Sequence, residues 1–185
     1  MWIGRRCNAR LTTLPNQWCR DNSTTAILNM IEINIPDYGQ LQLEHLVLDY
    51  NGTLAYDGVL RDGVIAALQE LANMLSIHVL TGDTFGLARS ALTVLPCMLL
   101  ILSAEGQDLA KKRYVEELGA HRTACIVNGR NDRLMLQVAA LGIVVTQEEG
   151  AATEALQAAD IVCPSIESAL GLLRNPLRMV ATLRS

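Results

Sequence analysis

Polar side chains that could do chemistry directly follow several apolar runs of this sequence. Three stretches do so: Asp49-Tyr50-Asn51-Gly52-Thr53 after Leu46–Leu48, Thr81-Gly82-Asp83 after Ile77–Leu80, and Asn128-Gly129-Arg130-Asn131-Asp132 after Ala124–Val127. A separate lysine, Lys111, lies early in the helix expected after the run Met98–Leu102. Carboxylates bind a hard cation such as Mg²⁺, hydroxyl and backbone N–H groups bind phosphate oxygens, and an ammonium group offsets their charge. An aspartate can also attack phosphorus and form an aspartyl phosphate.

An alternation of strand-length and helix-length segments would position these side chains. The expected strands are the four runs above together with Ile143–Val145 and Ile161–Cys163. The expected helices cover about residues 62–74, 84–94, 107–119, 131–140, 150–159 and 165–174. Alternating β and α units predict a parallel sheet with helices on both faces, and ligands bind outside the carboxyl ends of its strands. We therefore expect the polar stretches to meet at one edge of the sheet.

The first 29 residues differ in pattern from the rest of the chain. They contain both tryptophans and show no periodic apolar pattern, so we expect residues 1–29 to be a poorly ordered N-terminal extension. From Met30 onward isoleucine alternates with polar residues, and a second alternation follows a turn. This pattern predicts a β-hairpin over residues 31–44. We place one α/β domain at residues 30–185.

Composition and charge argue against several classes of protein. Half of the 185 residues are hydrophobic, yet no apolar run is long enough to span a bilayer. Residues 1–29 carry a net charge of +3, which leaves −7 for residues 30–185, and an acidic body without a basic stripe argues against a nucleic-acid partner. The five cysteines lack C-x-x-C spacing, and no secretion signal is visible, so we expect a cytoplasmic protein.

Four segments resemble, in order, the four motifs of the haloacid dehalogenase superfamily. Within that superfamily the likeness is to the phosphorylation domain of P-type ATPases and its soluble relatives. The segment Leu46–Leu54 resembles the first motif, an apolar strand followed by D-x-x-G-T, and Val79–Asp83 resembles the second. Ala110–Leu118 is similar to the third motif, which contains a lysine, and Asn128–Leu136 is similar to the fourth.

The resemblance implies a Mg²⁺-dependent phosphohydrolase in which Asp49 is the nucleophile. The catalytic residues that it implies are Asp49, Asn51, Thr81 and Lys111. The implied phosphate-binding residues are Gly52, Thr53, Thr81, Gly82, Lys111 and Asn131. The implied ligands of the Mg²⁺ ion are Asp49, Asn51, Asn128 and Asp132.

Two positions depart from the usual pattern of the superfamily. Asn51 stands where its phosphatases carry an aspartate that acts as general acid and base, and an amide cannot carry a proton. Asn128 stands where the fourth motif usually offers its first metal-binding aspartate. We therefore expect slow hydrolysis of a phosphate ester or acyl phosphate through an aspartyl phosphate. The alternative is a catalytically impaired regulatory module that binds phosphate or a nucleotide.

The resemblance also implies the fold class and the kind of partner. The fold would be a three-layer α/β/α sandwich of Rossmann-like type with a mainly parallel sheet. Members often insert a cap domain, but only residues 55–61 separate Thr53 from the next helix, and Leu102 lies close to Lys111, so we expect no cap. An open site suits a phosphoprotein, or a phosphorylated small molecule that a second copy encloses in a homo-oligomer.

Each of these residues also has a simpler interpretation. Asp49 could be a turn residue and Thr81 a helix cap, whereas Asp132 could complement a helix dipole. Asn128 and Asn131 could be turn formers only. Lys112 competes with Lys111, although the spacing of the third motif favours Lys111. The histidines lie far apart in the sequence, so we expect no histidine cluster and a structural role for each: His45, His78 and His121.

Overall fold

The computed structural model describes residues 30–83 and 86–185. The predicted extension over residues 1–29, and with it the domain boundary, lies outside the described residues. Part of the helix expected over residues 84–94 lies outside them as well.

Within the described residues six strands form one parallel sheet in the order β10-β9-β8-β3-β6-β7. Its strands are β3 (His45–Asp49), β6 (Ser76–Thr81), β7 (Cys97–Ile101), β8 (Thr123–Val127), β9 (Leu141–Val145) and β10 (Ile161–Cys163). Within this sheet β3 is the first strand along the chain and lies in the middle. The next two strands, β6 and β7, are added on one side of it, and β8, β9 and β10 are added on the other. The strand order therefore reverses at β3, and ligands of open α/β sheets bind at such a switch point. Asp49 is the last residue of this strand.

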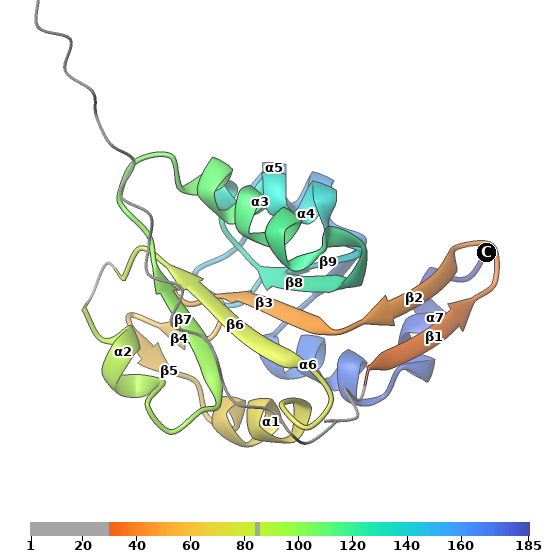
Figure 1. The fold of residues 1–185 in the computed structure, drawn as a ribbon, viewed down its shortest axis with the longest axis horizontal. Coiled ribbons are helices and arrows are strands. Elements are labelled where there is room, and N and C mark those ends of the chain that lie inside the picture. The colour runs from red at the N-terminus through yellow and green to blue at the C-terminus, as the bar shows by residue number, and fades with distance from the viewer. Residues whose placement is uncertain (1–29, 84–85) are drawn as a thin grey trace, which may run out of the picture.

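Helices cover both faces of the sheet, as the sequence predicts (Figure 1). One face carries α1 (Val64–Leu71), α2 (Ala88–Ala91) and α6 (Ile166–Arg174), and the other carries α3 (Gln107–Leu118), α4 (Arg133–Val138) and α5 (Thr153–Ala158). The central strand shows why: Leu46 and Leu48 pack into the hydrophobic cluster of α1 and α6, whereas Val47 packs into that of α3 and α4. A strand that is apolar on both sides needs a helix layer on each.

The predicted N-terminal hairpin is present as a separate two-stranded sheet. Its strands are β1 (Ile31–Ile35) and β2 (Gly39–Leu43), and they pair antiparallel. The isoleucines of β1 are buried and the residues between them are exposed. The hairpin contacts a helix that the sequence did not suggest to us, α7 (Leu177–Leu183), and the short 3₁₀ helix η1 (Ala120–Arg122). It thus lies beside the six-stranded sheet rather than in it (Figure 1).

Several local features differ from the sequence-based expectation. The segment between Thr53 and α1, for which we predicted no strand, forms a hairpin of β4 (Ala55–Tyr56) and β5 (Val59–Leu60). Its turn is Asp57-Gly58, both at positive φ, which matches the twist of a two-residue hairpin. The helix expected over residues 131–140 is the 3₁₀ helix η2 (Arg130–Asp132) followed by α4. Between Thr53 and α1 nothing larger than the β4–β5 hairpin is inserted, so this segment contains no cap domain.

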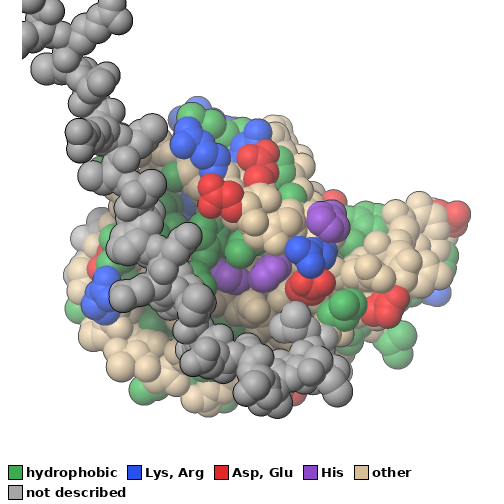
Figure 2. Space-filling view, in the orientation of Figure 1, with side chains coloured by type: hydrophobic (Ala, Val, Ile, Leu, Met, Phe, Trp, Pro, Cys, Tyr) green, Lys and Arg blue, Asp and Glu red, His purple; other side chains and the backbone are tan. Residues whose placement is uncertain are grey.

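The expectation that no histidines cluster is wrong. His45 of β3 and His78 of β6 lie on neighbouring strands, with His45 Nδ1 3.2 Å from His78 Nε2. The other ring nitrogen of His78, Nδ1, lies 2.9 Å from the hydroxyl of Tyr114 on α3. In Figure 2 two neighbouring histidine side chains are visible on this face of the molecule. The pairing of two strands brings together residues that the sequence separates by 33 positions.

The His78 ring should make the stability of the fold depend on pH. Burial, aided by His45, lowers the pKa of His78 to about 4. Between that value and the ordinary pKa of about 6.5, the unfolded chain binds a proton that the folded chain excludes, so the free energy of unfolding falls as the pH drops. Urea unfolding between pH 7 and 4 should show a shallower fall for His78→Gln than for wild type. His121→Gln, at an exposed position, should behave as wild type; equal slopes for all three proteins would contradict the assignment.

Candidate active site

Two carboxylates and one ammonium group meet at the carboxyl end of β3. Lys111 Nζ lies 2.6 Å from Oδ1 of Asp49 and 2.5 Å from Oδ1 of Asp132. The side chains of Lys111 and Asp132 are fully buried, whereas 12% of the Asp49 side chain is exposed. Solvent therefore reaches this cluster at Asp49. Lys112 instead pairs with Glu116 one helical turn away on the surface of α3, so Lys111 is the lysine that faces the site.

The charges of this cluster do not balance. Burial lowers the pKa of the Lys111 ammonium, but the two carboxylates outweigh it and hold that pKa above its usual value. Burial and the charge of Asp49 raise the pKa of Asp132 to about 6, although Lys111 and the Gly129 N–H act in the opposite direction. Two carboxylates around one ammonium leave one negative charge uncompensated when all are ionised. A second cation would neutralise it.

Asn128 lies against the loop that follows Asp49. Its Oδ1 accepts a hydrogen bond from the hydroxyl of Thr53 at 3.2 Å, and its Nδ2 donates to the carbonyl of Gly150 at 3.1 Å. Gly52 has φ +75°, and a Cβ there would lie 2.3 Å from Asn128 Nδ2. Only glycine therefore fits at position 52, both for its backbone conformation and for this close approach.

The other phosphate-binding candidates lie around the end of β6. The hydroxyl of Thr81 is buried and accepts a hydrogen bond from the N–H of Asp83 at 2.9 Å. Beside it, a Cβ on Gly82 would lie 2.7 Å from Nε2 of Gln107, and Gln107 Oε1 accepts from Asn131 Nδ2 at 2.8 Å. Gln107 thus connects the second and fourth motifs. We did not predict it, although it precedes Lys111 by one helical turn and so shares its face of α3.

The amide of Asn51 has an unsatisfied acceptor. Its Oδ1 is buried and has no hydrogen-bond partner among the described residues. A buried polar atom without a partner is costly and calls for an explanation, such as an ion or a ligand group. Across the part of the chain that the structure describes, no group of three or more His, Cys, Asp or Glu side chains is placed to hold a metal ion. Ligands at this site would therefore be two carboxylates supplemented by amide oxygens.

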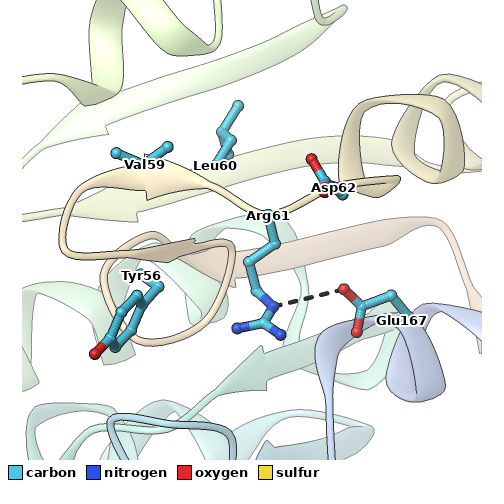
Figure 3. A pocket seen from close by; sticks show the side chains of 6 residues that line it. All are labelled: Tyr56, Val59, Leu60, Arg61, Asp62 and Glu167. Atoms are coloured by element: carbon cyan, nitrogen blue, oxygen red, sulfur yellow. Dashed lines mark ion pairs between the residues drawn. The ribbon is translucent and has the colours of Figure 1, made fainter.

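A pocket of about 320 Å³ lies next to the β4–β5 hairpin rather than at the carboxylates. Its lining is drawn in Figure 3 and consists of Tyr56, Val59, Leu60, Arg61, Asp62 and Glu167. Arg61 forms ion pairs with Glu167 and with Glu148. None of the predicted site residues lines this pocket.

Comparison with solved structures identifies the architecture. The deoxy-D-mannose-octulosonate 8-phosphate phosphatase of Haemophilus influenzae, solved with cobalt bound, superposes with a TM-score of 0.59 at 16% identity, covering 76% of this chain and 91% of that one. The fold is that of the haloacid dehalogenase superfamily, to which a superposed hydrolase of Legionella pneumophila is assigned by name. The corresponding phosphatase of Moraxella catarrhalis, solved with magnesium, phosphate and KDO, has the same haloacid dehalogenase architecture, with a TM-score of 0.55 at 15% identity over 77% of this chain and 94% of that one.

A third structure and one sequence relative extend the comparison. A zinc-transporting P-type ATPase superposes with a TM-score of 0.54 at 24% identity. The superposed region covers 66% of this chain and 20% of the ATPase chain. The protein MJ0073 of Methanocaldococcus jannaschii, which is uncharacterized, is 40% identical over 82 residues, 42% of this chain and 88% of its own length. The chain therefore belongs to the same family as MJ0073. No family model matches the sequence.

No helix in residues 30–83 or 86–185 is both long and apolar enough to cross a bilayer. On the face shown in Figure 2, acidic and basic side chains are interspersed. Three of the ion pairs that neutralise arginines are Arg122 with Glu44, Arg130 with Glu154, and Arg133 with Asp108.

The contacts of Asn128 lead to a testable expectation for metal dependence. Asn128→Asp adds a negative charge beside the loop that follows Asp49, so we expect the Mg²⁺ concentration for half-maximal activation to fall several-fold. The same change removes the donor to the Gly150 carbonyl, so the metal-free variant should lose about 1–3 kcal/mol of stability.

Mg²⁺ titrations of activity and of melting temperature would measure both effects. Asn175→Asp is the matched control, because Asn175 also donates to a backbone carbonyl at 3.1 Å but lies on α6's exposed end. An unchanged midpoint in Asn128→Asp would remove Asn128 from the set of metal ligands.

Proposed function

We propose that this protein is a Mg²⁺-dependent phosphohydrolase that works through an aspartyl phosphate on Asp49. The observation that carries the proposal is the buried ammonium of Lys111 between the carboxylates of Asp49 and Asp132, at the switch point of the sheet. A lysine that is fully buried and satisfied by two carboxylates is not a surface charge. It is suited to hold a reactive carboxylate in place while offsetting the charge of an incoming phosphate.

The donor set fits a magnesium ion. Asp49 and Asp132 offer carboxylate oxygens, Asn128 offers an amide oxygen that keeps a second lone pair, and Asn51 offers a buried oxygen without a partner among the described residues. The uncompensated negative charge of the cluster favours a cation. When bound, such an ion supplies Lewis-acid stabilisation of the phosphoryl oxygens.

The first chemical step would use the free oxygen of Asp49. Oδ1 accepts the hydrogen bond from Lys111, and Oδ2 makes no hydrogen bond with the described residues. Attack of Oδ2 on phosphorus forms the new O–P bond while the bond between phosphorus and the leaving group breaks. Lys111 stays bound to Oδ1 and holds the carboxylate in one orientation.

The second step would return Asp49 to its starting form. The oxygen of a water molecule attacks the phosphorus of the aspartyl phosphate, the bond from Asp49 to phosphorus breaks, and orthophosphate leaves. Asn51 stands where a proton acceptor for this water would help, and its amide cannot take the proton. Slow release of phosphate is the expected result of that substitution.

A second candidate function has one observation in its favour. Two amides, Asn51 and Asn128, occupy positions where carboxylates would serve an efficient phosphatase of this fold. A module that binds phosphate or a nucleotide without turnover would keep Lys111 and Thr81 but need no general acid. We rank it below hydrolysis because the Asp49 side chain is partly exposed and its Oδ2 makes no hydrogen bond with the described residues.

We expect the substrate to be a phosphorylated small molecule or a phosphoprotein, and the site to work in the cytoplasm. The superposed phosphatases whose names specify a substrate act on a sugar phosphate. In this chain the described residues near Asp49 include no cap, only the β4–β5 hairpin. A small substrate would then be enclosed by a second copy in a homo-oligomer.

A panel of aryl, acyl and alkyl phosphates, assayed with and without Mg²⁺, tests the proposal. Release of orthophosphate that requires Mg²⁺ and disappears in Asp49→Asn would support it. Binding of orthophosphate in the presence of Mg²⁺, without turnover of any member of the panel, would instead favour the binding module.

A further inference from the structure

Three main-chain groups converge on the carboxamide of Gln147, the second residue after β9. Its Nε2 donates hydrogen bonds to the carbonyls of Gly52 at 2.9 Å and Thr53 at 2.8 Å. Its Oε1 accepts a hydrogen bond from the N–H of Ile166, the first residue of α6, at 2.8 Å. One side chain therefore joins the loop after Asp49 to the start of a helix more than a hundred residues later. Sequence periodicity offers no signal for it.

The loop after Asp49 needs such an external donor. Within the loop the carbonyl of Tyr50 accepts hydrogen bonds from the N–H groups of Thr53, Leu54 and Ala55. The turn thus satisfies its own donors, while the carbonyls of Gly52 and Thr53 point to Gln147. Thr53 is fully buried, and a buried carbonyl without a donor costs free energy comparable to a lost hydrogen bond.

Residues 148–150, which follow Gln147, also contact the region between Asp49 and α1, directly or through Asn128. The carbonyl of Gly150 binds Asn128, whose Oδ1 in turn accepts from the Thr53 hydroxyl. Glu149 Oε1 accepts from the N–H of Asp57 at the tip of the β4–β5 hairpin, at 3.2 Å. Glu148 pairs with Arg61, which follows that hairpin and lines the pocket of Figure 3. Within this segment, Gln147 is the residue whose side chain contacts Gly52 and Thr53, in the loop after Asp49.

We propose that Gln147 is a positioning residue, which fixes the carbonyls of Gly52 and Thr53 so that the loop carries Asp49 in its reactive orientation. The inference deepens the proposed function and rests on it. Gln147 touches no reacting atom. Its effect would pass through Tyr50 and Asn51, the two residues that link Asp49 to Gly52. A small displacement of the nucleophile slows the chemical step more than it weakens substrate binding.

Two substitutions separate the donor role of Gln147 from its acceptor role. Gln147→Glu keeps an acceptor for the Ile166 N–H but places a carboxylate against two carbonyls. Gln147→Met keeps the length and removes both roles. Gln137→Met is the matched control, because Gln137 is exposed on α4. All are assayed with an aryl phosphate and Mg²⁺ at a temperature where each variant is folded.

We expect kcat to fall by about 10²-fold in both Gln147 variants, with KM changed less than threefold. The control should match wild type in both constants. A merely structural role predicts a lower melting temperature with kcat unchanged below it, and that outcome would overturn the inference.

Hydrogen–deuterium exchange of the peptide over residues 50–55 gives a readout that does not depend on turnover. Exchange should be faster in Gln147→Met and Gln147→Glu than in wild type and Gln137→Met. If wild type hydrolyses no phosphate, the proposed function fails while faster exchange still supports the tie from Gln147 to the loop. If exchange is equal in all four proteins, the inference fails even when wild type is an active phosphatase.

Discussion

Asp49→Asn should abolish turnover of every phosphate ester, with a loss of about 10⁴-fold or more, as removal of a nucleophile does elsewhere. An amide oxygen is too weak a nucleophile to attack phosphorus. The fold should survive, because asparagine has nearly the same volume and its oxygen can still accept the hydrogen bond from Lys111. Lys111 also keeps Asp132 as a charged partner.

Steady-state assays, together with a thermal melt, would measure this loss. Glu117→Gln, an exposed carboxylate-to-amide change on α3, is the control and should retain full activity. Trapping of phosphoenzyme with acetyl phosphate should label wild type and leave Asp49→Asn unlabelled. Retained turnover in Asp49→Asn would show that hydrolysis does not pass through an aspartyl phosphate on Asp49.

Asn51→Asp should shorten the lifetime of the aspartyl phosphate, by up to about 10²–10⁴-fold if the new carboxyl acts as a general base. In wild type, aryl and acyl phosphates need little help from an acid in the first step, because their leaving groups are good. The second step should lag, so a pre-steady-state burst is expected. Stopped-flow release of an aryl alcohol and decay of trapped phosphoenzyme measure the two steps.

Asn51→Asp should also lower the stability of the metal-free protein through electrostatic repulsion. A carboxylate at position 51 would add a negative charge two residues from Asp49, and Asp49 and Asp132 already outnumber the single ammonium of Lys111. The metal-free Asn51→Asp protein should therefore melt lower than wild type, and Mg²⁺ should restore most of the difference. Fast turnover of alkyl phosphates by wild type without a burst would contradict the expected slow second step and point to another general acid, with Asp83, two residues after the end of β6, as the candidate.

Local patterns in the sequence were sufficient for most of the architecture. The alternation of isoleucines predicts the β1–β2 hairpin, and each apolar run predicts a strand within one or two residues of its observed ends. The small features were missed for physical reasons. The β4–β5 hairpin has strands of two residues each, too short to show periodicity, although Asp57-Gly58 was a turn signal. Helix α7 packs against β1, which lies at the other end of the described sequence, so no local pattern indicates this contact.

The residues of the candidate site divide in the same way. Asp49, Lys111 and Asp132 could be selected from motif order because each follows its own strand, and a parallel sheet brings strand ends together. Motif order favoured Lys111, and burial against two carboxylates distinguishes it from Lys112. The pairing of His45 with His78 depends on which strands are neighbours, which no local pattern encodes.

The sequence by itself determined the α/β class and the approximate strand ends, and it predicted a set of candidate phosphate-binding side chains. Only the tertiary structure decided how those side chains are held. Gln107 and Gln147 form hydrogen bonds with Asn131 and with the carbonyls of Gly52 and Thr53, across 24 to 95 positions of the chain. The physical reason is that a neutral amide leaves no trace in hydrophobic periodicity or charge. Its role appears only when folding places a donor opposite an acceptor that would otherwise be buried without a partner.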